Sequence, residues 1–339
     1  MDLYIWLTQT LLPELCESFV DPRKRVSIIY LCTAILLVFI WGLTSGLSLK
    51  SGLRAVTSGL LSKKILLSRS SMGDYKLLII NRILFSLKAP FFLSKTAFTA
   101  FLFFYLNEVF PTQNSILSAT PVIFVTVAYT VILFLVDDLS RFITHYALHR
   151  FEVLWAFHKI HHSAETLSPL TVFRTHPVEG IIFGLRSLLA QGIVVACFVF
   201  FFGSQVDLVS VLGVNVLIFI FNATGANLRH SHVPISYGRS LEIFFLSPVQ
   251  HQLHHSKSPK HYNCNFGVVL AVWDKALGTH SLDYSQEKLQ FGLGDQKCQY
   301  NNTLFKMYVY PFCEVSGILK RRTVEFFNKL SKGENSAFQ

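Results

Sequence analysis

Ten of the thirteen histidines lie in two short windows of the sequence, and their spacing has a clear chemical meaning. The first window contains an HxxxH pair and an HxxHH triplet, and the second contains an HxH pair and another HxxHH triplet. The members are His145, His149, His158, His161, His162, His230, His232, His251, His254 and His255. Because residues three and four positions apart share one face of a helix, the members of each HxxxH or HxxHH motif would point the same way.

The number of clustered histidines indicates how many metal ions they would bind. Neutral imidazole is a good ligand for iron, zinc, copper and nickel. The two triplets and the HxxxH pair supply eight ligands, and His230 or His232 brings the set to nine or ten. A single motif of this kind is commonly a solvated helix face, but three together exceed what one four-coordinate zinc ion takes. The pattern therefore predicts two metal ions, each with an open position for a small ligand.

Three further residues near the windows could orient the ligand histidines. Asp138, His176 and Glu179 are candidates to hold the ring N–H groups of ligands. Structural alternatives stand beside this role: Asp138 and Glu179 as acids near the start of a helix, and His176 as a helix cap before Pro177. His261 and His280 have no partner at helical spacing, and we expect neither to bind a metal.

The composition places these histidines in a membrane protein. Of the 339 residues, 51% are hydrophobic and only 15% are charged, where about 25% is usual for a soluble domain. The net charge of +10 suits basic loops that flank membrane spans and contact anionic lipid, so we expect no nucleic-acid partner. Six scattered cysteines without a CxxC pair argue against a disulfide framework or a zinc ribbon.

Hydropathy predicts five membrane-spanning helices, since each needs about 20 mostly apolar residues. The predicted spans are 27–49, 90–106, 118–136, 179–202 and 206–224, with an interfacial helix at 77–87 and the last two spans forming a hairpin. Residues 50–88 hold eight Lys and Arg and residues 107–117 hold none, which predicts a cytoplasmic first loop. Both histidine windows would then emerge on the cytoplasmic face.

The fold class predicted from these patterns is all-α. We expect a polytopic bundle of transmembrane helices with a cytoplasmic helical cap that holds the histidine-rich site for two metals. Residues 1–110 would form an N-terminal membrane region, 118–280 a catalytic domain, and 281–339 a cytoplasmic C-terminal tail.

From about Asp138 to Thr279 the sequence resembles the fatty acid hydroxylase/sterol desaturase superfamily of membrane di-iron enzymes. Beyond the histidine motifs, the resemblance includes Leu154-Trp155, Phe173-Arg174, His176-Pro177, Arg229-His230, Ser247-Pro248, Asn265-Phe266-Gly267 and Trp273-Asp274. The arrangement looks most like the bacterial sterol-desaturase-like branch, related to alkylglycerol monooxygenases. Two positions depart from the commonest pattern. Tyr146 replaces an Arg, and His232 stands where many relatives carry a non-ligand such as Asn, so the ligand role of His232 stays open.

The resemblance implies an oxidoreductase that uses two iron ions and O₂ to hydroxylate or desaturate a C–H bond of a bilayer lipid, such as a fatty acyl chain or a sterol. Such chemistry needs a redox metal. The sequence has no nucleotide-binding, haem or iron–sulfur motif, so electrons would come from a separate cytochrome b5- or ferredoxin-type donor with an NAD(P)H reductase. The enzyme would lie in a bacterial inner membrane, or in the endoplasmic reticulum if eukaryotic, with its active site on the cytoplasmic face.

Two rival functions fit parts of the pattern. Zinc shares imidazole ligands with iron, so a dizinc, non-oxidative enzyme that modifies lipids is one alternative. A divalent-metal transporter is a remoter one, because transport needs polar residues along the spans. Only Arg186, Gln191, Asn215 and Asn222 qualify in the predicted spans.

Overall fold

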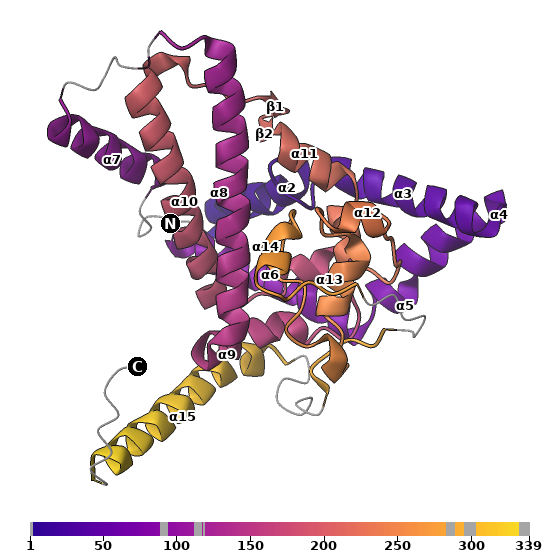
Figure 1. Cartoon of the computed structure of the whole chain (residues 1–339). Helices are drawn as coiled ribbons and strands as arrows, with labels where there is room; N and C mark the ends of the chain where they lie inside the picture. Colours follow the sequence, from indigo (N-terminus) through magenta and orange to yellow (C-terminus); the bar gives the residue numbers. More distant parts are fainter. Residues whose placement is uncertain are drawn as a thin grey trace.

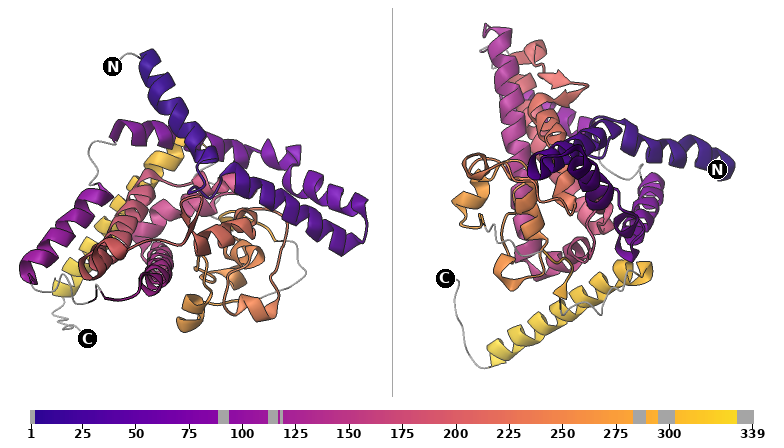
Figure 2. Two further views of the ribbon diagram at one scale, coloured as in Figure 1. Left: turned by 90° about the horizontal axis from the view of Figure 1, so that it is seen from above. Right: turned by 90° about the vertical axis from the view of Figure 1, so that its right-hand side faces the viewer.

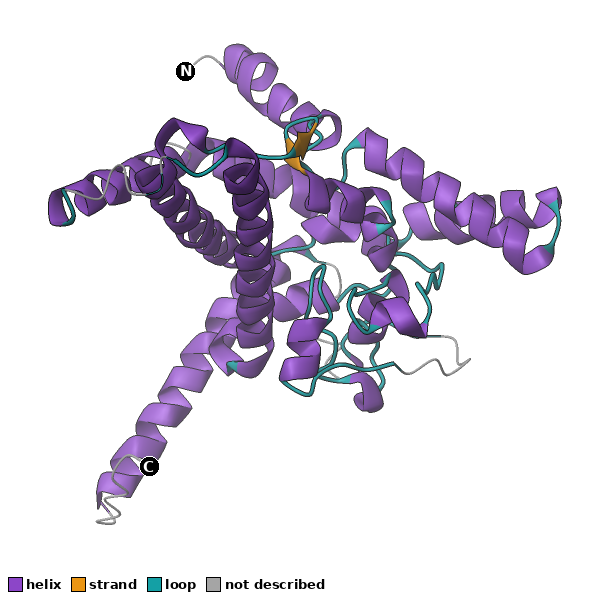
Figure 3. Ribbon diagram, turned by 45° about the horizontal axis from the view of Figure 1, so that its top comes forward, coloured by secondary structure: helices purple, strands orange, loops and turns teal. Residues whose placement is uncertain are grey.

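The computed structural model describes residues 3–88, 94–111, 117, 119–282, 289–294 and 303–331. Within these ranges the regular structure is helical apart from one short pair of strands (Figure 3). Three helical stretches in the described part are long and apolar enough to cross a membrane: α3 (Ile28–Gly46), α8 (Val122–Arg150) and the stretch Pro177–Gln205, which begins with α10 (Pro177–Phe202). The prediction of a helical membrane protein is therefore confirmed.

The long helix α8 joins the membrane to the first histidine window. It begins directly after Pro121, a residue suited to a helix start, and its first half is apolar. At 1.5 Å per residue, its 29 residues extend about 43 Å, well beyond the thickness of a bilayer core. His145 and His149 lie at its C-terminal end, so the membrane span and two candidate ligands belong to one rigid rod.

The helix α10 lies antiparallel to α8 and starts beside the second half of the first window (Figure 1). The ring of Tyr129 on α8 packs against that of Phe198 on α10, with centroids 5.2 Å apart. Asp137 on α8 accepts hydrogen bonds from Arg186 and Gln191 on α10, each at 2.8 Å. These polar side chains within apolar helices thus satisfy one another.

The predicted span at 206–224 is wrong. After the turn η5 (Gly203–Gln205), this segment forms β1 (Ser210–Val211), β2 (Val214–Asn215) and α11 (Val216–Ala223), whose eight residues reach only about 12 Å. Leu212 and Gly213 both have positive φ, which makes the tight turn between the strands.

Polar groups explain why this apolar segment is not one continuous helix. The side chain of Asn215 accepts a hydrogen bond from the Leu217 amide and so starts α11. The Asn215 amide also donates to the Thr130 carbonyl at 2.9 Å, and the Val209 amide donates to the Thr130 hydroxyl at 3.0 Å. The Thr130 hydroxyl thus satisfies one backbone amide of the extended stretch, and the β1–β2 pairing satisfies others, so this stretch does not need to be helical.

Short elements beside the C-terminal half of α8 carry the rest of the first histidine window and the second window (Figure 1). They are α9 (Glu152–His162), η4 (Pro169–Phe173), η6 (Ala226–His230), α12 (Arg239–Glu242), α13 (Pro248–His254), η7 (Pro259–His261) and α14 (Val272–Ala276). Loops of irregular backbone connect these elements. Apart from His145 and His149 on α8, the clustered histidines therefore lie on short segments.

The N-terminal region packs on this part of the molecule. Its elements are α1 (Leu3–Trp6), η1 (Leu7–Leu11), α2 (Leu12–Val20), α4 (Leu49–Arg54), η2 (Ala55–Leu60), α5 (Lys63–Leu66) and α6 (Arg69–Lys88). The predicted interfacial helix 77–87 lies within α6. Asp74 of α6 forms a buried ion pair with Arg174 at 2.9 Å and accepts a hydrogen bond from Thr171. The contact ties α6 to the segment that leads into α10.

Two other helices flank the long rods. The predicted span 90–106 corresponds to α7 (Lys95–Val109), which packs on α10, while residues 90–93 lie outside the described ranges. In the predicted C-terminal tail, α15 (Leu304–Ser331) begins against α9, where Met307 packs with Leu77 and Ile160. Figure 2 shows the C-terminal half of α15 projecting away from the other helices.

The packing of α7 on α10 gives a first prediction. A Cβ atom on Gly192 would lie 2.7 Å from the Phe98 ring, whereas a Cβ on Gly184 of the same helix meets nothing within 4 Å. Gly192→Leu should therefore destabilise the protein by about 1–3 kcal/mol through overpacking, and Gly184→Leu should not. Thermal unfolding of both variants in the same detergent checks this, and equal unfolding temperatures would contradict the helix contact.

Candidate metal centre

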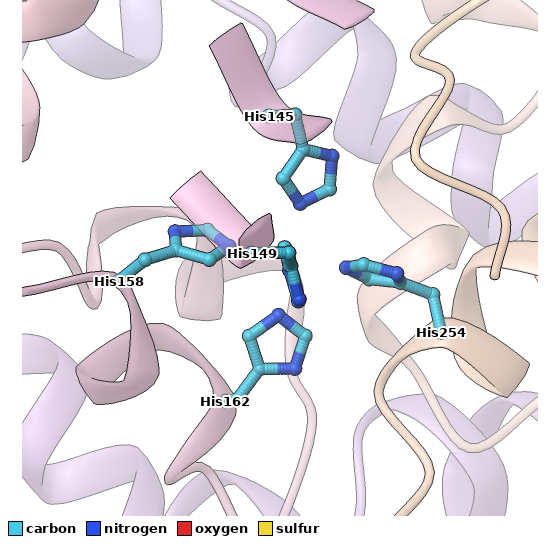
Figure 4. A group of neighbouring side chains, drawn as sticks. All are labelled: His145, His149, His158, His162 and His254. Carbon is cyan, nitrogen blue, oxygen red and sulfur yellow. The ribbon is translucent and has the colours of Figure 1, made fainter. Parts of the chain in front are cut away.

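Nine of the ten clustered histidines form two adjacent groups. The ligand nitrogens within each group lie within 4.8 Å of one another. Group 1 contains His145, His149, His158, His162 and His254, and group 2 contains His161, His230, His251 and His255. Figure 4 shows the rings of group 1 arranged around a common centre. The His162 and His255 rings stack with centroids 4.5 Å apart, which brings the two groups into contact.

Each HxxHH triplet is divided between the two groups. On α9, His158 and His162 belong to group 1 and His161 to group 2. At the second triplet the assignment is reversed: His251 and His255 belong to group 2 and His254 to group 1. The members four residues apart therefore serve one group, and the residue between them serves the other.

The hydrogen bonds of group 1 direct free nitrogen lone pairs towards its centre. The Nδ1 atoms of His145 and His254 lie 2.7 Å from the carbonyls of Phe266 and Cys264. A carbonyl only accepts, so each Nδ1 carries the hydrogen and each Nε2 is left with its lone pair. The buried Nε2 atoms of His149, His158, His162 and His254 have no hydrogen-bond partner. Buried polar atoms without partners are costly, and a cation at the centre would satisfy these.

The geometry of group 2 also fits a metal ion. The Nε2 atoms of His230, His251 and His255 lie 3.1–3.2 Å from one another. Two nitrogens bound to one ion at about 2.1 Å lie roughly 3.0–3.4 Å apart, from right-angled to tetrahedral geometry. Each neutral imidazole carries one ring hydrogen, so each Nε2 is either a donor or an acceptor. Three nitrogens that all contact one another therefore cannot all be joined by hydrogen bonds.

Two arginines give group 2 a different environment from group 1. Arg229 donates to His251 Nδ1 at 2.8 Å, and Arg25 donates to His230 Nδ1 at 3.0 Å. Loss of hydration on burial lowers the pKa of Arg25 to about 9 and that of Arg229 to about 10, yet both stay largely cationic at neutral pH. Group 1 therefore has acceptors behind its rings, whereas two rings of group 2 face positive charge. A guanidinium only donates, so in this arrangement the hydrogen of the neutral His230 and His251 rings lies on Nε2, and metal binding through Nε2 would require these arginine hydrogen bonds to break.

Glu179 contacts a histidine of group 1, as the sequence suggested. It lies in the first turn of α10, and its Oε1 is 3.0 Å from His158 Nδ1. Both side chains are buried. Its position also suits the positive end of the helix dipole. The start of α10 is thereby tied to the ring that it orients.

Asp138 acts on the site through a loop and has no direct hydrogen bond to a histidine. It lies in the middle of α8, so it is not an acid at a helix start either. Its carboxylate accepts hydrogen bonds from the Val269 and Leu270 amides and the Trp273 indole at 2.9–3.0 Å. This loop begins with the Phe266 carbonyl that holds His145.

His176 corresponds to the helix-cap alternative. Its Nδ1 accepts from the Val178 amide at 3.1 Å, and its Nε2 lies 3.3 Å from the Tyr308 carbonyl. These contacts fix the start of α10 and the nearby α15 and leave neither ring nitrogen for a ligand histidine.

The remaining histidines lie outside both groups. His232, the possible tenth ligand, is exposed, and its Nε2 accepts from the Leu167 amide at 3.3 Å. His261 is buried and His280 contacts Gln250, and neither belongs to group 1 or group 2.

Burial keeps the candidate ligands in the neutral form. It lowers the pKa of His161, His162, His251 and His255 well below the usual value, and neighbouring basic groups lower it further. Burial lowers the pKa of His254 to about 3 despite its contact with the Cys264 carbonyl. Neutral imidazole is the form that binds metals.

A cavity of about 280 Å³ opens onto both groups. Its histidine walls are His149, His162, His254 and His255, and Trp155, Tyr262 and Leu293 are among the other lining residues. The centre is therefore accessible to a small molecule or to one end of a larger one.

Several supporting groups were not found from the sequence. In the sequence, Arg25 stands in a basic run before a predicted span with nothing to link it to a histidine, and backbone carbonyls such as those of Cys264 and Phe266 leave no side-chain signal. Arg229 stands next to His230 in the sequence, but this position does not show that its guanidinium contacts His251. Asp274, which accepts from the Phe266 and Gly267 amides, was noted only within the family motif.

Comparisons with known proteins agree with the family resemblance. Residues 130–279 match the family described as Fatty acid hydroxylase. The chain is 24% identical over 196 residues to an alkylglycerol monooxygenase of Danio rerio, covering 56% of this chain and 40% of the relative. It is 29% identical over 157 residues to the ornithine lipid hydroxylase OlsE of Rhizobium tropici, covering 45% of this chain and 42% of the relative.

A third relative, the alkylglycerol monooxygenase of Homo sapiens, is 26% identical over 160 residues, covering 47% of this chain and 32% of the relative. The chain thus spans less than half the length of these curated relatives. No solved structure matches the chain.

The Glu179 contact predicts a change in metal affinity. Glu179→Ala removes the acceptor behind His158 and should weaken metal binding about 10–100-fold. Glu179→Gln keeps an acceptor and should lose less. Glu152→Ala is the matched control, because Glu152 is an exposed acid in the first turn of α9. Competition with a chelator measures the affinities, and equal values for the two Ala variants would contradict the role of Glu179.

The lowered histidine pKa values predict how the metal-free protein responds to acid. In the unfolded chain these histidines titrate near about 6.5, so below that pH the unfolded state binds more protons than the folded state. Their contribution to stability is present above about pH 6.5 and is lost as pH falls. Thermal unfolding of chelator-treated protein should show a steep decrease between about pH 7 and 5. An unfolding temperature that stays level or rises in this window would contradict the burial of neutral rings.

Proposed function

We propose that the protein is an oxidoreductase that uses O₂ to hydroxylate a C–H bond of a membrane lipid, since residues 130–279 match the family described as Fatty acid hydroxylase. The observation that carries the proposal is the pair of all-histidine groups, buried at one end of membrane helices and open to a cavity. The names of the relatives, monooxygenase and hydroxylase, favour oxygen insertion over desaturation.

We propose that the nine grouped histidines bind two iron ions, one in each group. Bound iron would supply the one-electron and O₂ chemistry that amino-acid side chains lack. The protein's own residues position the ligands: the Phe266 and Cys264 carbonyls and Glu179 hold ring N–H groups, while Asp138 fixes the loop. The reacting lipid carbon would occupy the cavity beside Trp155 and Leu293.

The partners and the location follow from the same proposal. Electrons would reach the site from a separate cytochrome b5- or ferredoxin-type donor with an NAD(P)H reductase. The multi-pass protein would lie in a bacterial inner membrane, or in the endoplasmic reticulum if eukaryotic, with the site on the cytoplasmic face. The eight Lys and Arg in residues 50–88 support that orientation.

The rival functions are distinguishable. A dizinc enzyme fits the ligand geometry equally well and differs in needing no O₂. The transporter alternative is weakened because Asp137 binds Arg186 and Gln191, and Asn215 caps α11, which leaves these polar groups engaged.

Substitution of one grouped histidine tests the proposal. His254→Ala removes a buried ligand and should reduce metal content and abolish product formation. His232 lies outside both histidine groups, so His232→Ala should keep its metal content and its activity. The assay supplies iron, a reductase and carrier, lipid extract and O₂ labelled with heavy oxygen. Mass spectrometry should find one labelled oxygen atom in a lipid. A product without the label, or full metal content and turnover in His254→Ala, would count against the function.

A further inference from the structure

A second cavity, of about 240 Å³, lies outside the histidine groups and is lined by basic residues. The segment before α3, together with α6, α8, η4 and α11, forms its walls; Figure 1 shows α6, α8 and α11 in the central part of the molecule. The basic lining residues are Arg23, Lys24, Arg25, Arg82 and Arg141. The lining contains no Asp or Glu, so the cavity has a strong positive charge.

Part of this charge has no counterion. Arg23 pairs with Asp21 at 3.0 Å, and Arg141 pairs with Asp137 at 2.7 Å. Among the residues that the structure describes, no carboxylate forms an ion pair with Lys24, Arg25 or Arg82. In addition, the buried Nε of Arg25 has no hydrogen-bond partner. Lys24 and Arg82 are partly exposed and therefore solvated, and an anion in the cavity would add attraction to these cations and an acceptor for the Arg25 Nε.

Arg25 connects this cavity to the metal centre. Its Nη2 donates to His230 Nδ1 at 3.0 Å, and its carbonyl accepts from the Asn227 side chain at 2.8 Å. The guanidinium is thus fixed between the cavity and group 2. A ligand bound in the cavity would be separated from group 2 by this one side chain.

Most of the remaining lining is apolar, with Ser18 and Asn222 as its polar members. Val172, Phe173, Ile218, Phe221, Val268 and Val269 face the same space. Guanidinium groups bind phosphate and carboxylate oxygens in paired hydrogen bonds, whereas the apolar residues suit hydrocarbon. The combination matches a ligand with an anionic oxygen group at one end and a hydrocarbon chain next to it.

We propose that this cavity binds the phosphate or carboxylate group of an anionic membrane lipid and, resting on the proposed function, that such a lipid is the substrate class. The lipid supplies the counterion for Lys24, Arg25 and Arg82, and its chain follows the apolar wall.

The binding experiment uses the metal-loaded protein in neutral detergent and does not depend on turnover. Short-chain phosphatidic acid, a fatty acid, phosphatidylcholine and inorganic phosphate are titrated separately, and retained ligand is measured by native mass spectrometry. The double variant Lys24→Gln/Arg82→Gln should weaken binding of phosphatidic acid or of the fatty acid about tenfold or more. Lys50→Gln/Arg54→Gln, at exposed positions outside the cavity, is the matched control and should bind like the unaltered protein.

The outcomes distinguish a lipid from free phosphate as the ligand, and they distinguish the lipid site from the proposed function. If both double variants lost lipid affinity equally, or if neither lost any, the assignment of the lipid site to this cavity would be overturned. Inorganic phosphate binding as tightly as the lipids would overturn the lipid part. In the turnover assay, the cavity variant should raise KM for the anionic lipid at unchanged metal content, and an unchanged KM would overturn the substrate class. Selective lipid binding without any oxidised product would overturn the proposed function and leave the lipid site supported.

Discussion

Asp138 lies two helical turns before His145 on α8 and accepts three hydrogen bonds from the loop between residues 269 and 273. That loop brings the Phe266 carbonyl back to His145, so α8 determines both the position of its own histidine and the tautomer of its ring. Asp274 holds the same loop from the other side. Without these two carboxylates, the loop amides would lose buried acceptors and the carbonyl would lose its fixed direction. The inward lone pair of His145 therefore depends on acids that touch no histidine.

How much the sequence predicts is clearest at the histidines and at 206–224. Helical spacing predicted which imidazoles share a face, and nine of the ten do gather. It could not show that His161 and His254 serve a different group from their neighbours, because two groups so close together can divide one helix face. Hydropathy found α3, α8 and α10, but it measures the transfer of side chains and not the pairing of backbone groups. At 206–224, the Thr130 hydroxyl accepts from the Val209 amide and the two short strands pair with each other, so an apolar composition does not require a helix.

The two groups receive opposite support from the protein around them. Acceptors stand behind His145, His158 and His254 in group 1, whereas guanidinium groups stand behind His230 and His251 in group 2. Ring N–H donation strengthens an imidazole as a ligand, and an adjacent cation opposes binding of another cation. We therefore expect group 1 to bind its metal ion more tightly than group 2.

Arg25 lies more than a hundred residues before the region that matches the family, yet it contacts a histidine of group 2. The boundary drawn by sequence similarity is therefore not a boundary of the metal environment. Positive charge beside a metal ion favours its reduced state, so the reduction potential of iron in group 2 would depend on the N-terminal region. A chimera that exchanged this region between relatives would change the charge beside group 2, and so the potential of an iron ion bound there, although every ligand stayed the same.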